Sequence, residues 1–94
     1  MFARVATFEG GDVDRLRQLN EERTASGTLN PPAGVRRALV LEGERRLFIT
    51  FFDTREELEA AEARFEQMGE EVPEEVRGRR TSVDVYEVVF DREM

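Results

Sequence analysis

The sequence contains no cysteine, histidine, tryptophan or lysine, and every basic side chain is an arginine. Without cysteine there is no disulfide, no thiolate nucleophile and no cysteine-based zinc site. Without histidine the chain lacks the usual general base near neutral pH and the commonest metal ligand. Without lysine no Schiff base forms with a carbonyl substrate. From these absences we expect no metal and no cofactor, and the catalytic residues, if there are any, stay unknown.

Long apolar runs and a positive charge balance are also missing. No segment approaches the roughly 20 apolar residues of a membrane-spanning helix, and the first residues lack the pattern of a signal peptide, so we expect a cytoplasmic protein that does not bind membranes. The net charge is −7, which disfavours nucleic acid as a partner. We interpret the adjacent arginines as solvated or ion-paired charges near strand ends: Arg36-Arg37, Arg45-Arg46 and Arg79-Arg80.

The hydrophobic pattern alternates between the period of a strand and that of a helix. Strands are predicted at 2–9, 35–42, 45–52 and 81–90, and residues 26–34 form a loop rich in proline and glycine. One helix begins after a capping Asp12 and runs to about Thr24. A second begins after Thr54, which has the capping-box spacing to Glu57, and stops near Gly69. Residues 73–76 add one helical turn.

The order strand, helix, strand, strand, helix, strand predicts an α+β fold. Right-handed crossovers turn this order into a ferredoxin-like βαββαβ plait, a four-stranded antiparallel sheet with two helices on one face. With 94 residues, the chain has the size of one domain. We therefore expect residues 1–94 to form a single domain.

Both faces of this sheet are apolar, although two helices can cover only one. Strand 45–52 places Leu47, Ile49 and Phe51 on one side, with Phe48 and Phe52 on the other. Such a patch left in water would forfeit on the order of 10 kcal/mol. We therefore expect a homodimer whose sheets pack face to face; the alternative is a monomer whose loops cover the open face.

Three stretches carry a resemblance to a known family: MFARVATFEG, FITFFDTREELEAAE and SVDVYEVV. Together with the element order they resemble the dimeric α+β barrel superfamily, specifically antibiotic-biosynthesis monooxygenase-like (ABM-like) domains, over nearly the whole chain. The resemblance implies a homodimer with a small pocket between each sheet and its own helices. It also implies a cofactor-independent monooxygenase acting on a small aromatic or quinol-type compound, although these stretches are fold signatures and not catalytic ones.

The chain departs from this family where its chemistry resides. Phe52 stands where many relatives have a tryptophan, and Ala3 appears in place of a strand asparagine. The haem-degrading relatives bind iron through a histidine, and here Glu62 lies near that place. Haem degradation is therefore disfavoured, and a non-catalytic protein that binds a small apolar ligand, or an accessory protein of the same fold, is the alternative. The sequence does not name the ligand, the pathway or a hetero-partner.

The candidate ligand pocket consists of residues expected on the helix-facing side of the sheet and on the helices: Asn20, Thr50, Phe52, Phe65 and Tyr86. We expect Ala3, Val5, Leu16 and Met68 to line it as well, and an ordinary filled core is the alternative. Arg4 interrupts the first strand, and we expect it to face Glu87 or Asp84 on the dimer side.

Overall fold

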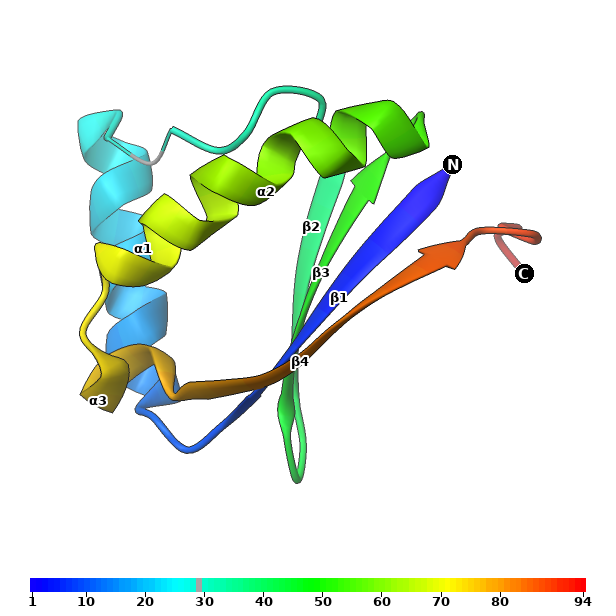
Figure 1. Ribbon diagram of the computed structural model, residues 1–94. Helices are drawn as coiled ribbons and strands as arrows, with labels where there is room; N and C mark the ends of the chain where they lie inside the picture. The colour runs from blue at the N-terminus through cyan, green and yellow to red at the C-terminus, as the bar shows by residue number, and fades with distance from the viewer. Residues whose placement is uncertain (29) are drawn as a thin grey trace.

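The computed structural model describes residues 1–28 and 30–94; Leu29, within the predicted loop, lies outside the described residues. The strands form an antiparallel sheet in the spatial order β2-β3-β1-β4. Figure 1 shows α1 and α2 on the same side of this sheet, so the predicted ferredoxin-like α+β fold is confirmed. The elements are β1 Phe2–Glu9, α1 Val13–Ser26, β2 Arg37–Glu42, β3 Arg46–Phe52, α2 Arg55–Glu70, α3 Glu74–Arg77 and β4 Arg79–Glu87.

The helices begin where the sequence predicted. The Asp12 carboxylate accepts a hydrogen bond from Arg15 N (3.1 Å) at the start of α1. Thr54 Oγ1 accepts one from Glu57 N (3.2 Å) at the start of α2. These side chains serve backbone amides that have no partner within the helix. The helices end slightly later than the sequence predicted: α1 runs two residues past Thr24, and α2 runs one residue past Gly69.

Strand pairing sets the two faces of the sheet. Arg4 lies opposite Thr50 on β3 and Val85 on β4, and these side chains point toward the helices. Val5 and Ile49 are opposite each other on the other face, which no helix covers (Figure 1). The predicted alternation of β1 and β3 is thereby confirmed.

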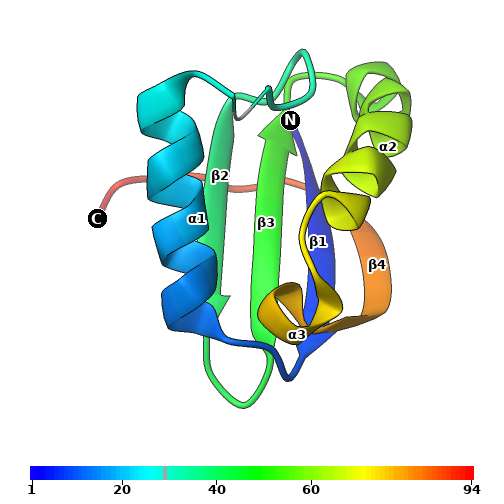
Figure 2. The ribbon, with the colours of Figure 1, turned by 90° about the vertical axis from the view of Figure 1, so that its left-hand side faces the viewer.

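The fourth strand is shorter at its end than the sequence predicted. Pairing was expected to reach Phe90, but β4 ends at Glu87. Val88 N still donates to Met1 O (2.9 Å), after which the chain leaves the sheet. Figure 2 shows this tail crossing behind the sheet, on the side opposite the helices.

A compact aromatic cluster holds α2 against β3. Phe52, Leu58, Ala61 and Phe65 are buried together. The Phe65 ring meets the Phe52 ring edge to face, with centroids 6.3 Å apart. Burying each large apolar side chain contributes about 1.5 to 3 kcal/mol, so this cluster fixes α2 on the sheet.

Helix α1 is attached differently, because none of its residues is buried. Asp12 N, at its start, donates to Val76 O (2.9 Å), and Arg23 Nη2, in its last turn, donates to Glu71 O (3.0 Å). In Figure 2 it lies over the β2 side of the sheet while α2 lies over the β1 side, and β3 is visible between them. The helix is therefore held at its ends, and its middle stands away from the strands.

Among the described residues, no helix combines the length and the apolar character needed to cross a bilayer.

Candidate functional site

A hollow of about 820 Å³ lies between α1, α2 and the helix-facing side of the sheet. Its volume falls within the range of about 300 to 1,000 Å³ that is usual for small-molecule sites. It exists because α2 packs on one half of the sheet while α1 is held off the other half at its two ends. Space remains above β2 and β3.

Apolar side chains form the walls of this hollow. Phe48 projects from β3, and its ring meets the Phe65 ring of α2 edge to face at 6.2 Å. Met68 continues the α2 wall, and Leu16 and Leu19 face it from α1. Val13, near the start of α1, lines the hollow together with these two leucines. Such a surface suits a flat apolar molecule.

Arg4 lies at the bottom of the hollow, with only 1% of the residue exposed. Its Nε donates to Glu62 Oε1 at 2.7 Å and its Nη2 to Glu62 Oε2 at 3.2 Å, a two-pronged ion pair from β1 to α2. The guanidinium carbon also lies 4.3 Å from the centroid of the Phe65 ring. The pair and the ring together offset the cost of burying a charge.

A second buried arginine lines the hollow near the other end of β3. The Nε of Arg46 donates to Glu42 Oε2 (2.8 Å), and its Nη1 donates to Arg77 O (3.1 Å). The residue is 5% exposed. Cations are therefore fixed on the same face of the sheet at separate points beneath the apolar walls.

Thr50 lies beside Arg4 across the β1–β3 pairing and also lines the hollow. The residue is 1% exposed, and its hydroxyl makes no hydrogen bond to any described residue. A buried polar group without a partner costs about 1 to 3 kcal/mol. Thr50 therefore carries a buried, unpartnered hydroxyl at the sheet side of the hollow.

The structure brings together part of the predicted pocket. Asn20, Thr50 and Phe65 line the hollow. Phe52 is fully buried in the core cluster below it. Tyr86 is 57% exposed and lies opposite Ala3, on the face turned away from the helices. Its expected place in the pocket is therefore wrong.

The same register corrects two further expectations. Ala3 and Val5, which were expected to line the pocket, belong to the open face of the sheet. Leu16 and Met68 do line the hollow, as expected. Arg4 was expected to meet Glu87 or Asp84 on the dimer side, but it points the other way and binds Glu62. Side chains alternate between the two faces along β1, so the sequence alone already placed Arg4 on the same face as Phe2, Ala6 and Phe8.

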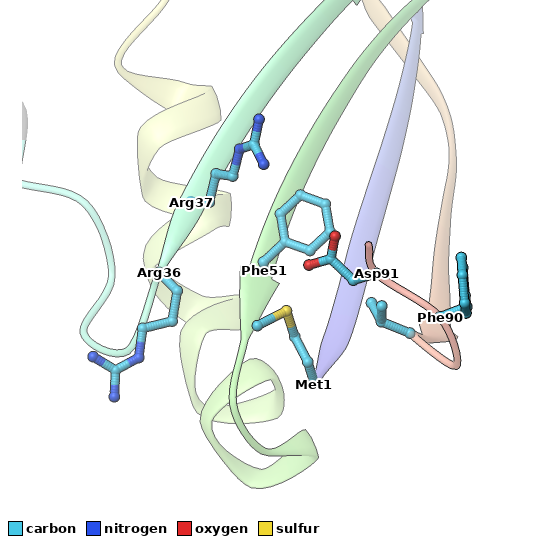
Figure 3. A pocket seen from close by; sticks show the side chains of 7 residues that line it. Met1, Arg36, Arg37, Phe51, Phe90 and Asp91 are labelled. Atoms are coloured by element: carbon cyan, nitrogen blue, oxygen red, sulfur yellow. The ribbon is translucent and has the colours of Figure 1, made fainter. Parts of the chain in front are cut away.

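A smaller recess of about 220 Å³ lies on the open face, beneath the C-terminal tail (Figure 3). Met1, Phe51 and Phe90 contribute its apolar surface, and Asp91 contributes a carboxylate. Figure 3 shows Arg36 pointing away from the recess, toward Asp53, with which it forms an ion pair. Its small size and mixed lining make it a poor ligand site beside the larger hollow.

Comparison with solved structures finds the same fold. A point mutant of MhuD, crystallised with two manganese protoporphyrin IX bound per active site, superposes with a TM-score of 0.59 at 14% sequence identity, covering 100% of each chain. No protein-family model matches the sequence, and no curated protein does. The chain therefore has the ABM-like fold that its sequence suggested.

Proposed function

We propose that the protein binds a small aromatic molecule in the hollow between α1, α2 and the sheet. The observation that carries the proposal is an open, apolar space whose wall includes the buried, unpartnered hydroxyl of Thr50. A filled core would leave no such space, and a purely structural threonine would have found a partner. The MhuD mutant of the same fold holds planar macrocycles in its active site, which supports a flat ligand here.

Haem itself does not fit the residues of this hollow. Histidine and cysteine are absent from the sequence, and Tyr86 lies on the other face of the sheet. Of the side chains that ordinarily bind haem iron, only Met68 is among the described residues that line the space. We therefore assign no haem to this chain, and an organic ligand without a metal is the better match.

Ligand binding is tested by titration with N-phenyl-1-naphthylamine, a neutral probe whose fluorescence rises in apolar surroundings. Ala38, on β2, lines the hollow, so we expect Ala38→Trp to narrow it and to lower the affinity for the probe. Ala63→Trp places the same side chain on an exposed position of α2 and leaves binding intact. Equal binding by the wild type and Ala38→Trp, or no binding by the wild type, overturns the proposal.

A second candidate function is cofactor-independent oxygenation of the bound molecule. The observation that favours it is the pair of buried arginines at the hollow, because a fixed cation stabilises the anion of an ionised quinol. Such an anion can itself donate electrons to oxygen. A quinol and one O₂ then yield a hydroxyquinone and one water, and each product receives one of the two oxygen atoms of O₂.

Oxygen uptake separates this activity from binding alone. With a panel of quinols and anthrones, the wild type is expected to consume one O₂ per substrate, and Ala38→Trp is expected to lose this uptake. Uptake no faster than in buffer alone eliminates the oxygenase and leaves the binding function.

We also propose that the working unit is a homodimer joined through the open faces of the sheets. Val5, Leu47, Ile49 and Phe51 line the uncovered face, and the tail beyond it exposes Phe90. An apolar surface of this extent usually meets a partner, and a second copy of the chain offers a matching one.

A further inference from the structure

We propose that the ligand of this hollow is an anion, an aromatic molecule that carries a carboxylate, sulfonate or similar acidic group, and that Arg4 binds that group. This inference rests on the proposed ligand-binding function and specifies the class of molecule. The observation behind it is the buried guanidinium of Arg4, which has a donor outside its ion pair.

The hollow is rich in arginine although the protein as a whole is acidic. Seven arginines and four glutamates are among its described lining residues, in a chain of net charge −7. A concave surface with low-dielectric walls concentrates the potential of such groups. Ion pairs with carboxylates engage six of these seven arginines, so an anion would be bound by a guanidinium that has a donor to spare.

Arg4 is the arginine best placed to bind a ligand. Its Nε and Nη2 each donate one hydrogen bond to Glu62, so Nη1 takes no part in this ion pair. Arginine has five N–H donors, more than one carboxylate requires. A second acid can therefore bind the same guanidinium.

The neighbours of Arg4 orient the rest of the ligand. Its guanidinium lies over the Phe65 ring at 4.3 Å, and Phe48 meets the same ring. Thr50, opposite Arg4 in the sheet, adds an unpartnered hydroxyl. A flat molecule against these rings would have its acidic end at Arg4 and Thr50.

The pair Arg4–Glu62 has a simpler interpretation, in which it only ties β1 to α2. Glu62 is 41% exposed in its side chain while Arg4 is 2% exposed. If the pair were only a tie, removing its charge would change stability without changing which probes bind. The two interpretations therefore make different predictions about charge selectivity.

Two fluorescent probes of one scaffold test this inference. N-phenyl-1-naphthylamine is neutral, and 8-anilinonaphthalene-1-sulfonate is the same molecule with a sulfonate. We expect the wild type to bind the sulfonate at least about tenfold more tightly, since a charge-assisted hydrogen bond is worth this factor or more. Ala38→Trp, with Ala63→Trp as its control, shows that both signals come from the hollow.

Substitutions at the ion pair then assign the selectivity to Arg4. Arg4→Met keeps the length of the side chain and is expected to weaken the sulfonate about tenfold while leaving the neutral probe unchanged. Glu62→Gln keeps the guanidinium and is expected to retain or increase the preference. Arg55→Met, at an exposed arginine of α2 that pairs with Glu59, is the matched control.

The outcomes separate this inference from the function on which it rests. Equal affinity of the wild type for both probes overturns the anionic ligand and leaves the binding function standing. A preference that survives in folded Arg4→Met also overturns it. Binding of neither probe contradicts the proposed function itself. If Arg4→Met does not fold, the wild-type comparison and Glu62→Gln decide, because a sulfonate preference that is lost in folded Glu62→Gln would overturn binding of the acidic group at Arg4.

Discussion

At the scale of single residues, the side chains at the hollow were only partly predictable. Alternation along β3 predicted that Thr50 and Phe52 face the helices, and both do. It did not predict the depth at which each lies, because depth depends on how closely a helix packs above it. Phe52 lies under α2 in the core, whereas Thr50 lies at an open space.

Thr50 provides a prediction about stability. Thr50→Val replaces an unpartnered hydroxyl by a methyl group of similar size, so we expect the free energy of unfolding to rise by about 1 kcal/mol. Thr50→Ser keeps the hydroxyl, removes a methyl group and is expected to lower it. Urea denaturation measures both. A valine variant less stable than the wild type would show that the hydroxyl has a partner within the fold.

Glu71 provides a prediction about pH. The hydrogen bond from Arg64 (2.8 Å) lowers the pKa of this carboxyl below its ordinary value of 4.5, and Arg23 adds to the effect. A carboxyl whose pKa is lowered in the folded state stabilises the protein above its ordinary pKa, and this contribution is lost as the pH falls through the folded value. Glu71→Gln is therefore expected to be less stable than the wild type at neutral pH.

The difference between Glu71→Gln and the wild type is expected to vanish in acid, below the lowered pKa of Glu71 in the folded protein. Denaturation curves across this range measure it, with Glu56→Gln, at an exposed position of α2, as the control. A difference that stays constant with pH would contradict the role given to the ion pair.

At the scale of elements, the caps and the alternation were sufficient to predict every strand and helix, but not the position of α1. Its apolar stripe of Val13, Leu16 and Leu19 is narrow, and a narrow stripe predicts an amphipathic helix without saying how deeply it docks. The structure leaves all three side chains only partly buried, at the wall of the hollow. The space itself therefore could not be predicted from the pattern.

The start of α1 depends on a close contact between two connections. Gly11 has φ +85°, and a Cβ there would lie 2.6 Å from Gly78 N and 2.7 Å from Val76 O. Gly10 also has positive φ (+76°), but a Cβ there would meet open space. The β1–α1 and α3–β4 connections therefore touch backbone to backbone at Gly11 and Gly78.

These adjacent glycines form a matched pair of substitutions. Gly10→Ala bears only the backbone cost of positive φ, and we expect about 1 kcal/mol of destabilisation. Gly11→Ala adds a collision with fixed backbone, and we expect about 2 to 4 kcal/mol. Thermal and chemical denaturation give both values. Equal effects at the two positions would show that the connections do not touch.

At the scale of the whole molecule, the sequence predicted the layers but not the register between β1 and β4. The valines of β4 indicate a strand with two apolar sides, yet either side could have faced the helices. Pairing of Tyr86 with Ala3 decides the question and places the tyrosine on the open face. A register between strands at opposite ends of the chain is not contained in the pattern of either strand.

The open face provides the prediction about assembly. Sedimentation equilibrium at micromolar concentration is expected to give twice the 10.9 kDa of one chain. Leu41 and Tyr86 are exposed at 47% and 57% on this face, so replacing both by glutamate is expected to give a folded monomer. Ala63→Glu, on the outer surface of α2, should stay dimeric. A monomeric wild type would contradict the proposed assembly.

The central claim is that the hollow above β3 is a ligand site. Its most direct test is a crystal structure with 6-bromo-2-naphthoate, in which anomalous scattering locates the bromine. We expect a bromine peak within the hollow, beside Phe48 and Phe65, with the carboxylate at Arg4. Bromine found only outside the hollow, or α1 packed down on β2 and β3 with no space between them, would contradict it.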